Sequence, residues 1–320
     1  MNAGALRVGL FAALWLIASG AIASARELKS IGVSLPDFEI PFFSEVNRGI
    51  KTAAQRIGAE VIAFPNHHDV GQQTQQIQEF MAKGTDLIIL YPDDEKALGP
   101  IVKQAQAAGV IVVAVARRLG DASANVGTNA DEAAGLACKY LAEQLGQKGN
   151  VVIINGPPDP VASARVDGCE KSLAQYPEMK VLSSDANGQW SEYGGKKAME
   201  ALLLKFNTID GVFAVNSDEA RGAETALRGA GRSVKAIVSV GSTILDTAGM
   251  SNESMIAAVV IERAFSIGEQ AVIIGTKLLK GEKLPSKDVS IQPVLVSRQT
   301  LATYPDCCRL VPPTCGGCAQ

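Results

Sequence analysis

The fold of this chain is indicated most clearly by residues 85–116, which read TDLIILYPDDEKALGPIVKQAQAAGVIVVAVA. Two short and almost wholly apolar runs, 87–91 and 111–116, lie at its two ends. The segment between them starts with acidic residues and closes on Ala108-Gly109, where the left-handed end of a helix favours glycine. Apolar runs of this kind are typical of parallel strands that are covered on both faces. The stretch therefore predicts a strand–helix–strand unit of a parallel sheet.

The same alternation recurs along the chain. Helical spacing of apolar residues marks 46–57, 136–145 and 198–204, and we expect the N-caps of helices at Asp69, Asp93, Asp131 and Ser191. The chain is therefore expected to be a doubly wound α/β protein. Further strands are predicted at 31–35, 61–64, 151–155, 212–215, 237–240 and 256–260.

One strand–helix pattern occurs twice. Residues 85–90 lead into Asp94-Glu95 and end at Ala108-Gly109, and residues 209–214 lead into Asp218-Glu219 and end at Ala230-Gly231, 209 − 85 = 124 residues later. Any α/β protein looks self-similar at this level, but the repeat favours two similar lobes.

Composition excludes several classes of protein. The chain has 320 residues, 47% of them hydrophobic, and 30 basic against 33 acidic side chains give a net charge of −3. Such a chain is too apolar to be disordered and too weakly charged to hold nucleic acid through phosphate contacts. At roughly 100–200 residues per domain, the length suggests two domains.

The first 25 residues predict an export signal. Arg7 precedes an apolar run over 8–22, and Ala23-Ser24-Ala25 supplies small residues for cleavage before Arg26. A membrane anchor is the alternative, but a run of about 15 residues is shorter than the ~20 that a bilayer requires. We therefore expect a soluble periplasmic protein without a membrane anchor, in an oxidising compartment.

Motifs of the common catalytic sites are missing from the sequence. It contains no G-x-G-x-x-G, no G-x-x-x-x-G-K-[ST], no G-x-S-x-G and no H-E-x-x-H. The two histidines, His67 and His68, are adjacent and are interpreted as part of a solvated turn. An exported two-lobed α/β protein without a catalytic set is most simply a ligand-binding protein. We expect it to be no enzyme and to carry no cofactor and no metal.

Several segments carry a resemblance to a known family. The first contains Ile31-Gly32-Val33-Ser34-Leu35, Ile40-Pro41-Phe42-Phe43 and Arg48-Gly49-Ile50, and it is followed in order by 84–92, the R-x-x-G segment 164–168, 212–223 and 278–283. In this order they resemble the ribose-type periplasmic binding proteins, the sugar-binding components of ABC importers, over about 29–303. The family is kin to LacI-type repressors, but the export signal and the lack of a helix-turn-helix argue against a repressor.

The resemblance implies a type I periplasmic binding protein. Two Rossmann-like, doubly wound lobes would be joined by a three-crossing hinge, with ligand between them at the carboxyl ends of the strands. We expect crossings near Thr128-Asn129, Ile261 to Arg263 and Ile291 to Pro293. Lobe one would comprise 26–128 plus 263–291, and lobe two 129–262 plus 292–310, followed by a tail over 311–320.

By the same resemblance, three aromatic side chains are expected at the ligand. Phe42 and Phe43 follow the first strand, and Trp190 lies where the second lobe of the family supplies its stacking residue. Flat rings suit the C–H face of a sugar while its hydroxyls reach polar groups at the rim. At least one phenylalanine is expected to contact ligand, and a core position for the other is the alternative.

Four polar residues complete the expected site. Arg117 and Arg165 match arginines that donate to sugar oxygens in the family, with a surface salt bridge as the alternative. Asn216 matches a ligand-binding amide, which can both donate and accept. Glu262 lies where the family often has Gln, and it could accept from hydroxyls or pair with an arginine.

Two departures from the family bear on specificity. Ala116 and Gly241 stand where ribose-type members carry Asp. Each hydroxyl donor left without an acceptor would cost roughly 1–3 kcal/mol, so ribose itself is not expected. A different polyol, a furanose or pentose-like ligand, or a sugar acid whose carboxylate meets Arg117 or Arg165 is expected instead.

The cysteines fall into two groups. Four lie near the C-terminus, where disulfides, unpaired thiols and a metal site are all open and the compartment favours disulfides. Two lie in predicted helices of the second lobe and are expected to be buried, small apolar side chains. The first group is Cys307, Cys308, Cys315 and Cys318, and the second is Cys138 and Cys169.

These observations predict a solute-binding protein that captures a small sugar-like ligand (a sugar, polyol or sugar acid) and delivers it to a membrane ABC permease. Capture, hinge closure and presentation of the closed form would be its mechanism. One alternative is a sensor that presents the bound sugar to a membrane receptor or sensor kinase. Another is an enzyme or metal-handling protein that acts through the cysteine tail. We expect a monomer with no nucleic-acid partner.

Overall fold

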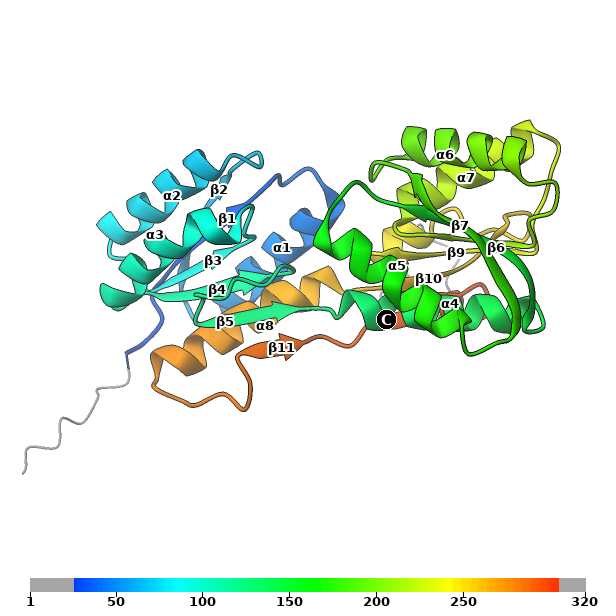
Figure 1. The fold of residues 1–320 in the computed structure, drawn as a ribbon. Helices are drawn as coiled ribbons and strands as arrows, with labels where there is room; N and C mark the ends of the chain where they lie inside the picture. Colours follow the sequence, from blue (N-terminus) through cyan, green and yellow to red (C-terminus); the bar gives the residue numbers. More distant parts are fainter. Residues whose placement is uncertain (1–25, 305–320) are drawn as a thin grey trace, which may run out of the picture.

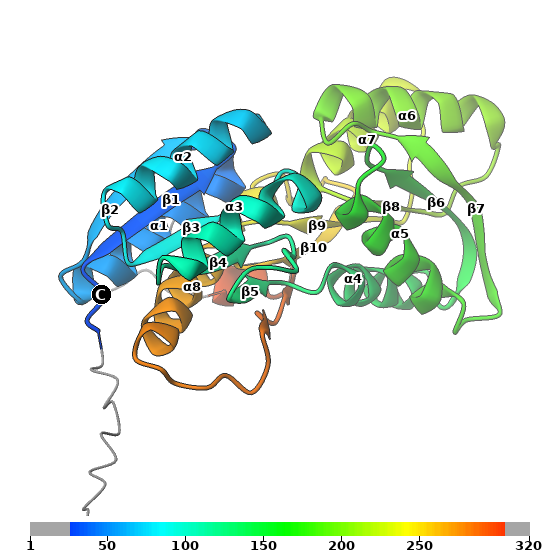
Figure 2. The same cartoon turned by 60° about the vertical axis from the view of Figure 1, so that its left-hand side comes forward.

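The computed structural model describes residues 26–304, which form two α/β lobes side by side (Figures 1 and 2). The predicted export signal, 1–25, and the four C-terminal cysteines lie outside the described residues. The strands are β1 Ser30–Leu35, β2 Glu60–Pro65, β3 Leu87–Leu90, β4 Ile111–Val115, β5 Ala124–Gly127, β6 Lys148–Asn155, β7 Glu178–Asn187, β8 Gly211–Ala214, β9 Ala236–Gly241, β10 Ile256–Ile261, β11 Asp288–Ser290 and β12 Val294–Ser297. The helices are α1 Pro41–Arg56, α2 Val70–Ala82, α3 Glu95–Ala107, α4 Ala130–Gln144, α5 Pro160–Leu173, α6 Glu192–Lys205, α7 Ser217–Gly229 and α8 Ala264–Leu279, with 3-10 turns η1 Ile244–Thr247 and η2 Leu301–Thr303.

The first lobe is built on a parallel sheet of order β11-β5-β4-β3-β1-β2. Helices α1 and α8 cover one face and α2 and α3 the other (Figure 1). Each pair closes its own apolar core, in which β3 and β4 are almost wholly buried. This two-sided burial explains why these strands are continuous apolar runs in the sequence.

The second lobe repeats the arrangement. Its sheet has the order β12-β10-β9-β8-β6-β7 and is parallel except for the antiparallel edge strand β12. Helices α4 and α5 cover one face and α6 and α7 the other. The order β7-β6-β8-β9-β10 reproduces β2-β1-β3-β4-β5, so β3–α3 and β8–α7, the repeated pattern of the sequence, occupy equivalent places.

The chain passes between the lobes three times. It crosses from β5 to α4, returns from β10 to α8, and crosses again from β11 to β12. Residues that follow the carboxyl ends of the central strands, such as Tyr91 after β3 and Arg117 after β4, therefore come close to the opposite lobe. In open α/β sheets this edge is where ligands bind.

Local details depart from the sequence prediction in places. Asp69 and Ser191 cap α2 and α6 as predicted, whereas α3 is capped by Asp94 and α4 by Asn129, each a residue or two from the predicted cap. The predicted cap positions fail because neighbouring Asp and Asn side chains compete for the same free N–H groups.

A disulfide in the second lobe corrects another expectation. Cys138 of α4 and Cys169 of α5 are fully buried, as expected, but they are bonded to each other, with Cα atoms 5.1 Å apart. Helices α4 and α5 approach closely enough to form this disulfide because Gly168 lies between them. A Cβ at Gly168 would come within 2.1 Å of the Asp131 carbonyl oxygen. The glycine of the R-x-x-G segment thus sets how α5 packs.

Within residues 26–304, no helix has the length and apolarity that a membrane span would require.

Candidate functional site

Aromatic side chains lie where the first lobe meets the second. Pro41 starts α1, and Phe43, in its first turn, is only 8% exposed and packs in the core of the lobe. Its ring meets Tyr91 edge-on, with centroids 5.0 Å apart, and Phe42 packs against it at 5.2 Å and is less buried. Phe43 is thus a supporting core residue, and Phe42 is the phenylalanine with more exposed surface.

Arg117 reaches from the first lobe to the second. Ala116 has a left-handed backbone, with φ of 63°, and the Arg117 N–H donates to the Val115 carbonyl at 2.7 Å, so the chain turns sharply after β4. The guanidinium lies 5.0 Å above the Tyr91 ring and forms an ion pair with Asp159 of the second lobe. Asp159 is fixed in place because its other carboxylate oxygen caps α5.

Arg165 is the buried cation of the second lobe. One of its Nη atoms donates to the Val215 carbonyl at 2.7 Å, and the other lies 2.7 Å from Oε1 of Glu262. Both side chains are about nine-tenths buried. Glu262 follows β10 at the crossing into the first lobe, where Thr128 of another crossing donates to its carbonyl. Of the two roles expected for Glu262, the structure shows pairing with an arginine.

Trp190 lies beside Arg165 on a tight turn between β7 and α6. Its ring centroid is 5.6 Å from the Arg165 guanidinium carbon, and its backbone N–H donates to Oε1 of Glu219 at 2.8 Å. Asn216 caps α7, because its Oδ1 accepts from the Glu219 N–H at 2.8 Å. The amide oxygen expected at the ligand is therefore engaged by the helix, which leaves its NH₂ group for other partners.

Two titratable groups in this network have strongly displaced pKa values. Burial raises the pKa of Tyr91 to about 12, although the nearby Arg117 and Arg165 oppose the rise. Burial likewise raises the pKa of Glu219 to about 8, against the opposing effects of the Trp190 N–H and Arg165. Tyr91 is therefore a neutral hydroxyl near pH 7, and the Glu219 carboxyl is mostly protonated.

Three buried polar atoms of these residues have no hydrogen-bond partner among the described residues. They are Nε of Arg117, Nε of Arg165 and Oε2 of Glu219. Buried donors and acceptors are normally paired, and leaving one unpaired is costly. A ligand with hydroxyl groups is the chemistry that would pair such donors and acceptors, since a hydroxyl can both donate and accept.

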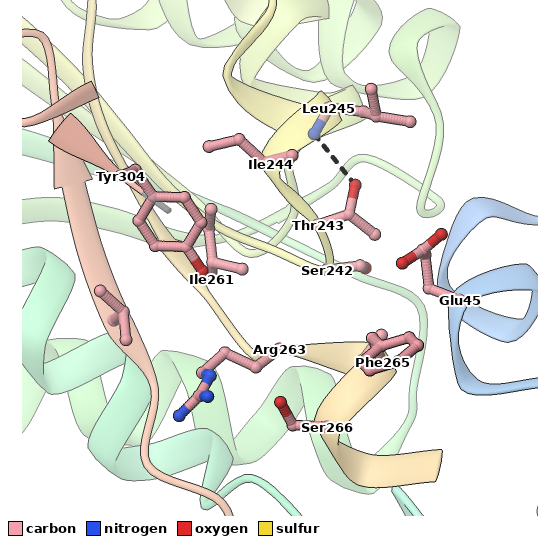
Figure 3. Close-up of a pocket in the computed structure, with 12 residues that line it drawn as sticks. Glu45, Ser242, Thr243, Ile244, Leu245, Ile261, Arg263, Phe265, Ser266 and Tyr304 are labelled. Carbon is pink, nitrogen blue, oxygen red and sulfur yellow. Dashed lines mark hydrogen bonds between the residues drawn. The ribbon is translucent and has the colours of Figure 1, made fainter. Parts of the chain in front are cut away.

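A cavity of about 490 Å³ lies elsewhere. It is beside the hinge, between Glu45 of α1, residues 242–245 after β9 and the start of α8 (Figure 3). Its lining is mostly apolar and includes none of the predicted site residues. A second cavity of about 370 Å³, on the crossings 127–130 and 288–290, is lined by Arg117. The converging polar groups, and not the larger cavity, mark the candidate site.

Comparisons with known proteins identify the family. A family model described as a periplasmic binding protein domain matches residues 31–283. The chain belongs to the periplasmic binding protein family. Membership confirms the predicted class, a solute-binding protein and not an enzyme, and it implies the periplasm as the compartment.

Curated members of the periplasmic binding protein family are similar over most of their length. The xylitol-binding protein of Mycolicibacterium smegmatis is 30% identical over 95% of this chain and 81% of its own. The ribose import binding protein of Escherichia coli is 25% identical over 83% of this chain and 90% of its own. The predicted ribose-type resemblance is thereby confirmed.

Solved structures confirm the fold. An ABC transporter solute-binding protein from Actinobacillus succinogenes, with bound D-allose, superposes with a TM-score of 0.78 at 23% identity and covers 86% of this chain and all of that chain. One from Mycobacterium smegmatis, with bound glycerol, gives a TM-score of 0.75 at 24% identity over 85% of this chain and 94% of that one. The predicted pair of Rossmann-like lobes is therefore the architecture of this periplasmic binding protein.

The structure joins the predicted residues in two chains of contacts, related by the effect of the Arg165 charge on Tyr91, and adds other residues; together they are called the network. A chain of contacts runs from Phe42 through Phe43, Tyr91, Arg117 and Asp159 across the lobes, and a second joins Glu262, Arg165, Trp190, Glu219 and Asn216. Sequence reasoning missed Tyr91, Asp159 and Glu219 as members. The positions of two were visible: Tyr91 ends a predicted strand, and Asp159 precedes a proline, a typical N-cap signal.

Proposed function

We propose that this protein captures a neutral sugar or polyol between its lobes and presents it to an ABC permease. The observation that carries the proposal is the polar and aromatic network that spans the lobes at the carboxyl ends of the strands. Relatives named for xylitol, ribose and D-apiose support the ligand class. Their names as import binding proteins support delivery to a permease.

The charge balance favours a neutral ligand over a sugar acid. Arg117 is paired with Asp159 and Arg165 with Glu262, so neither guanidinium offers an uncompensated charge to a carboxylate. A ligand carboxylate would also lie among these acidic groups, at a Coulombic cost. Hydroxyl groups, in contrast, can accept hydrogen bonds from the unpaired Nε donors of Arg117 and Arg165 without adding charge.

The aromatic residues supply the remaining recognition. Trp190 and Phe42 are partly exposed at the junction, and we infer that they contact the C–H faces of the ligand. Phe43 and Tyr91 support them from the core of lobe one.

Hinge motion completes the proposed mechanism. The lobes, assigned as 26–128 plus 263–291 and 129–262 plus 292–310, would close about the three crossings, and the ion pair between Arg117 and Asp159 would hold the closed form. We further propose that residues 1–25 are removed on export and that the protein has no membrane anchor. We also propose that it acts as a monomer, because one chain supplies the whole network. A sensor would use the same closed form, so a receptor partner is the alternative.

The test uses Trp190 as the reporter. The chain has two tryptophans, Trp15 and Trp190, so Trp190 is the only one once residues 1–25 are removed. Titration with xylitol, D-apiose and arabinose should change its fluorescence and raise the melting temperature, and ribose and matching sugar acids should not. Arg165→Met should abolish the response.

A matched control is Arg232→Met. Arg232 also donates to backbone carbonyls of lobe two, those of Leu203 and Phe206, but it lies outside the network. It should leave the titration unchanged. If no neutral carbohydrate alters fluorescence or melting, or if a sugar acid alone does, the proposed ligand class is wrong.

A further inference from the structure

Glu219 is a buried carboxyl that the expected binding site does not include. It lies in the first turn of α7 and is fully buried. Its Oε1 accepts from the backbone N–H of Trp190 at 2.8 Å, and its Oε2 has no hydrogen-bond partner among the described residues. Burial of an acidic group without a full set of hydrogen-bond partners costs free energy of folding. A carboxyl in this position therefore indicates a role beyond packing.

The turn that carries Trp190 requires support from outside. Gln189 and Trp190 both have φ of 54°, a left-handed conformation that side chains disfavour. Within the turn, the Ser191 N–H donates to Gly188, and the Gly188 N–H donates to Asn155 of β6. These bonds fix the ends of the turn but do not involve the backbone N–H of Trp190. That N–H donates to Glu219.

Two glycines pack directly against Glu219. A Cβ at Gly188 would lie 2.7 Å from Cδ of Glu219, and a Cβ at Gly195 would lie 2.4 Å from its main-chain carbonyl oxygen. Glycine at these two places lets the turn approach the carboxyl and lets the start of α6 approach the main chain of Glu219. The carboxyl is therefore in close contact with the turn that carries Trp190.

The Trp190 ring is held from two further sides. It lies over Arg165, and a Cβ at Gly156 would come within 3.0 Å of its edge. The charged groups that act on Glu219 are Arg165 of α5 and Asp218 of its own helix, while the turn 187–191 contains no titratable side chain. Because burial raises the pKa of Glu219 to about 8, the carboxyl is mostly neutral near pH 7, and Gln is its closest mimic.

We propose that Glu219 is a positioning residue, which fixes the Gly188–Ser191 turn and so sets the aromatic face that Trp190 offers to the ligand. The part of this inference that concerns ligand rests on the proposed function. The part that concerns Trp190 does not, because it can be measured without ligand.

The test compares three variants in the chain that starts at Arg26. Glu219→Met removes the acceptor at similar size, and Glu219→Gln keeps it. Glu224→Met is the matched control, because Glu224 lies on the same helix and accepts the Met255 N–H at 2.9 Å but does not contact the network. Without ligand, Glu219→Met should shift Trp190 emission to the red and increase acrylamide quenching, and the other two should not.

Binding gives the second measurement. With xylitol as the probe, or whichever screened carbohydrate binds the unmodified protein, Glu219→Met should weaken affinity roughly five- to tenfold, as expected for one lost hydrogen bond and a displaced ring. Glu219→Gln should restore affinity to within about twofold, and Glu224→Met should leave it unchanged. If Glu219→Met does not fold, Gly188→Ala, which pushes against the same carboxyl, should produce the same two changes.

Separate outcomes overturn the inference and the proposed function. Unchanged Trp190 emission and quenching in Glu219→Met or Gly188→Ala would overturn the positioning role, whatever binds. Unchanged affinity in a variant with altered emission would overturn the link between Trp190 and ligand. Failure of every neutral carbohydrate to bind the unmodified protein would overturn the proposed function while the emission result still decides the role of Glu219.

Discussion

Replacing Glu219 by Gln should make the stability of this protein less dependent on pH. The side chain is fully buried, and burial raises its pKa from an ordinary 4.5 to about 8. In the unfolded chain the same carboxyl ionises near its ordinary pKa. Gln keeps the acceptor for the Trp190 N–H and cannot ionise, so the comparison isolates the cost of the charge.

The sign and size follow from proton linkage. Below about pH 4.5 the carboxyl is protonated in both the folded and the unfolded chain, so it does not change the free energy of unfolding. Between pH 4.5 and about 8 the unfolded state loses the proton first, so the free energy of unfolding of the unmodified protein falls. At about 1.4 kcal/mol per pKa unit, the difference between the pKa values of 4.5 and about 8 corresponds to a loss of roughly 5 kcal/mol in the free energy of unfolding. The full loss is reached above pH 8 and is an upper limit.

Urea unfolding from pH 4.5 to 9, followed by circular dichroism, measures this difference. The stability of Glu219→Gln minus that of the unmodified protein should rise with pH across this window and level off above about pH 8. Glu224→Gln, on the same helix, should instead lose stability, because Glu224 pairs with Arg228 and accepts from Ser254. A Glu219→Gln difference that stays flat between pH 5 and 8.5 would refute the reasoning.

Three further predictions concern the network and its scaffold. Arg165→Met leaves Glu262 buried without its partner, and urea unfolding should show a loss of roughly 3–5 kcal/mol. Asp159→Asn keeps the cap of α5 but removes the charge that pairs across the lobes; small-angle scattering should show a more open protein, and an unchanged profile would contradict the role of this pair. Replacing Cys138 and Cys169 together by Ala should lower the free energy of unfolding by about 3–4 kcal/mol, from a closed loop with sequence separation 31.

The fold was predictable where burial controls the sequence. Strands β3, β4 and β8 are enclosed by helices on both faces, so each appears as a short apolar run with clear ends. Edge strands β7, β11 and β12 were missed, because partly exposed strands carry polar residues and lose the apolar signature. β5 was missed because its four residues are too short for any period.

The candidate site was predictable residue by residue but not as a network. Arg165 and Trp190 were found because they match family positions, and the structure places them side by side. Asp159 and Glu219 were missed because their importance comes from contacts across distant parts of the chain, with Arg117 and with Trp190. The disulfide was missed for the same reason, since spacing does not show that α4 and α5 face each other.

The network suggests how this chain balances the charge of Arg117 at a position next to Ala116, where the resemblance leads one to expect Asp. With Ala at 116, Arg117 has no acidic neighbour on its own strand, and its charge is balanced by Asp159 from the other lobe. Balance therefore depends on closure, because the two groups belong to different lobes. The pair is formed in this structure, and a neutral ligand would leave it intact, whereas a sugar acid would place a further carboxylate beside Asp159 and Glu262 and oppose closure by repulsion. Discrimination between neutral and acidic ligands is thus expected to weaken as salt screens the partly exposed pair, which titrations at about 0.02 M and 1 M NaCl would measure.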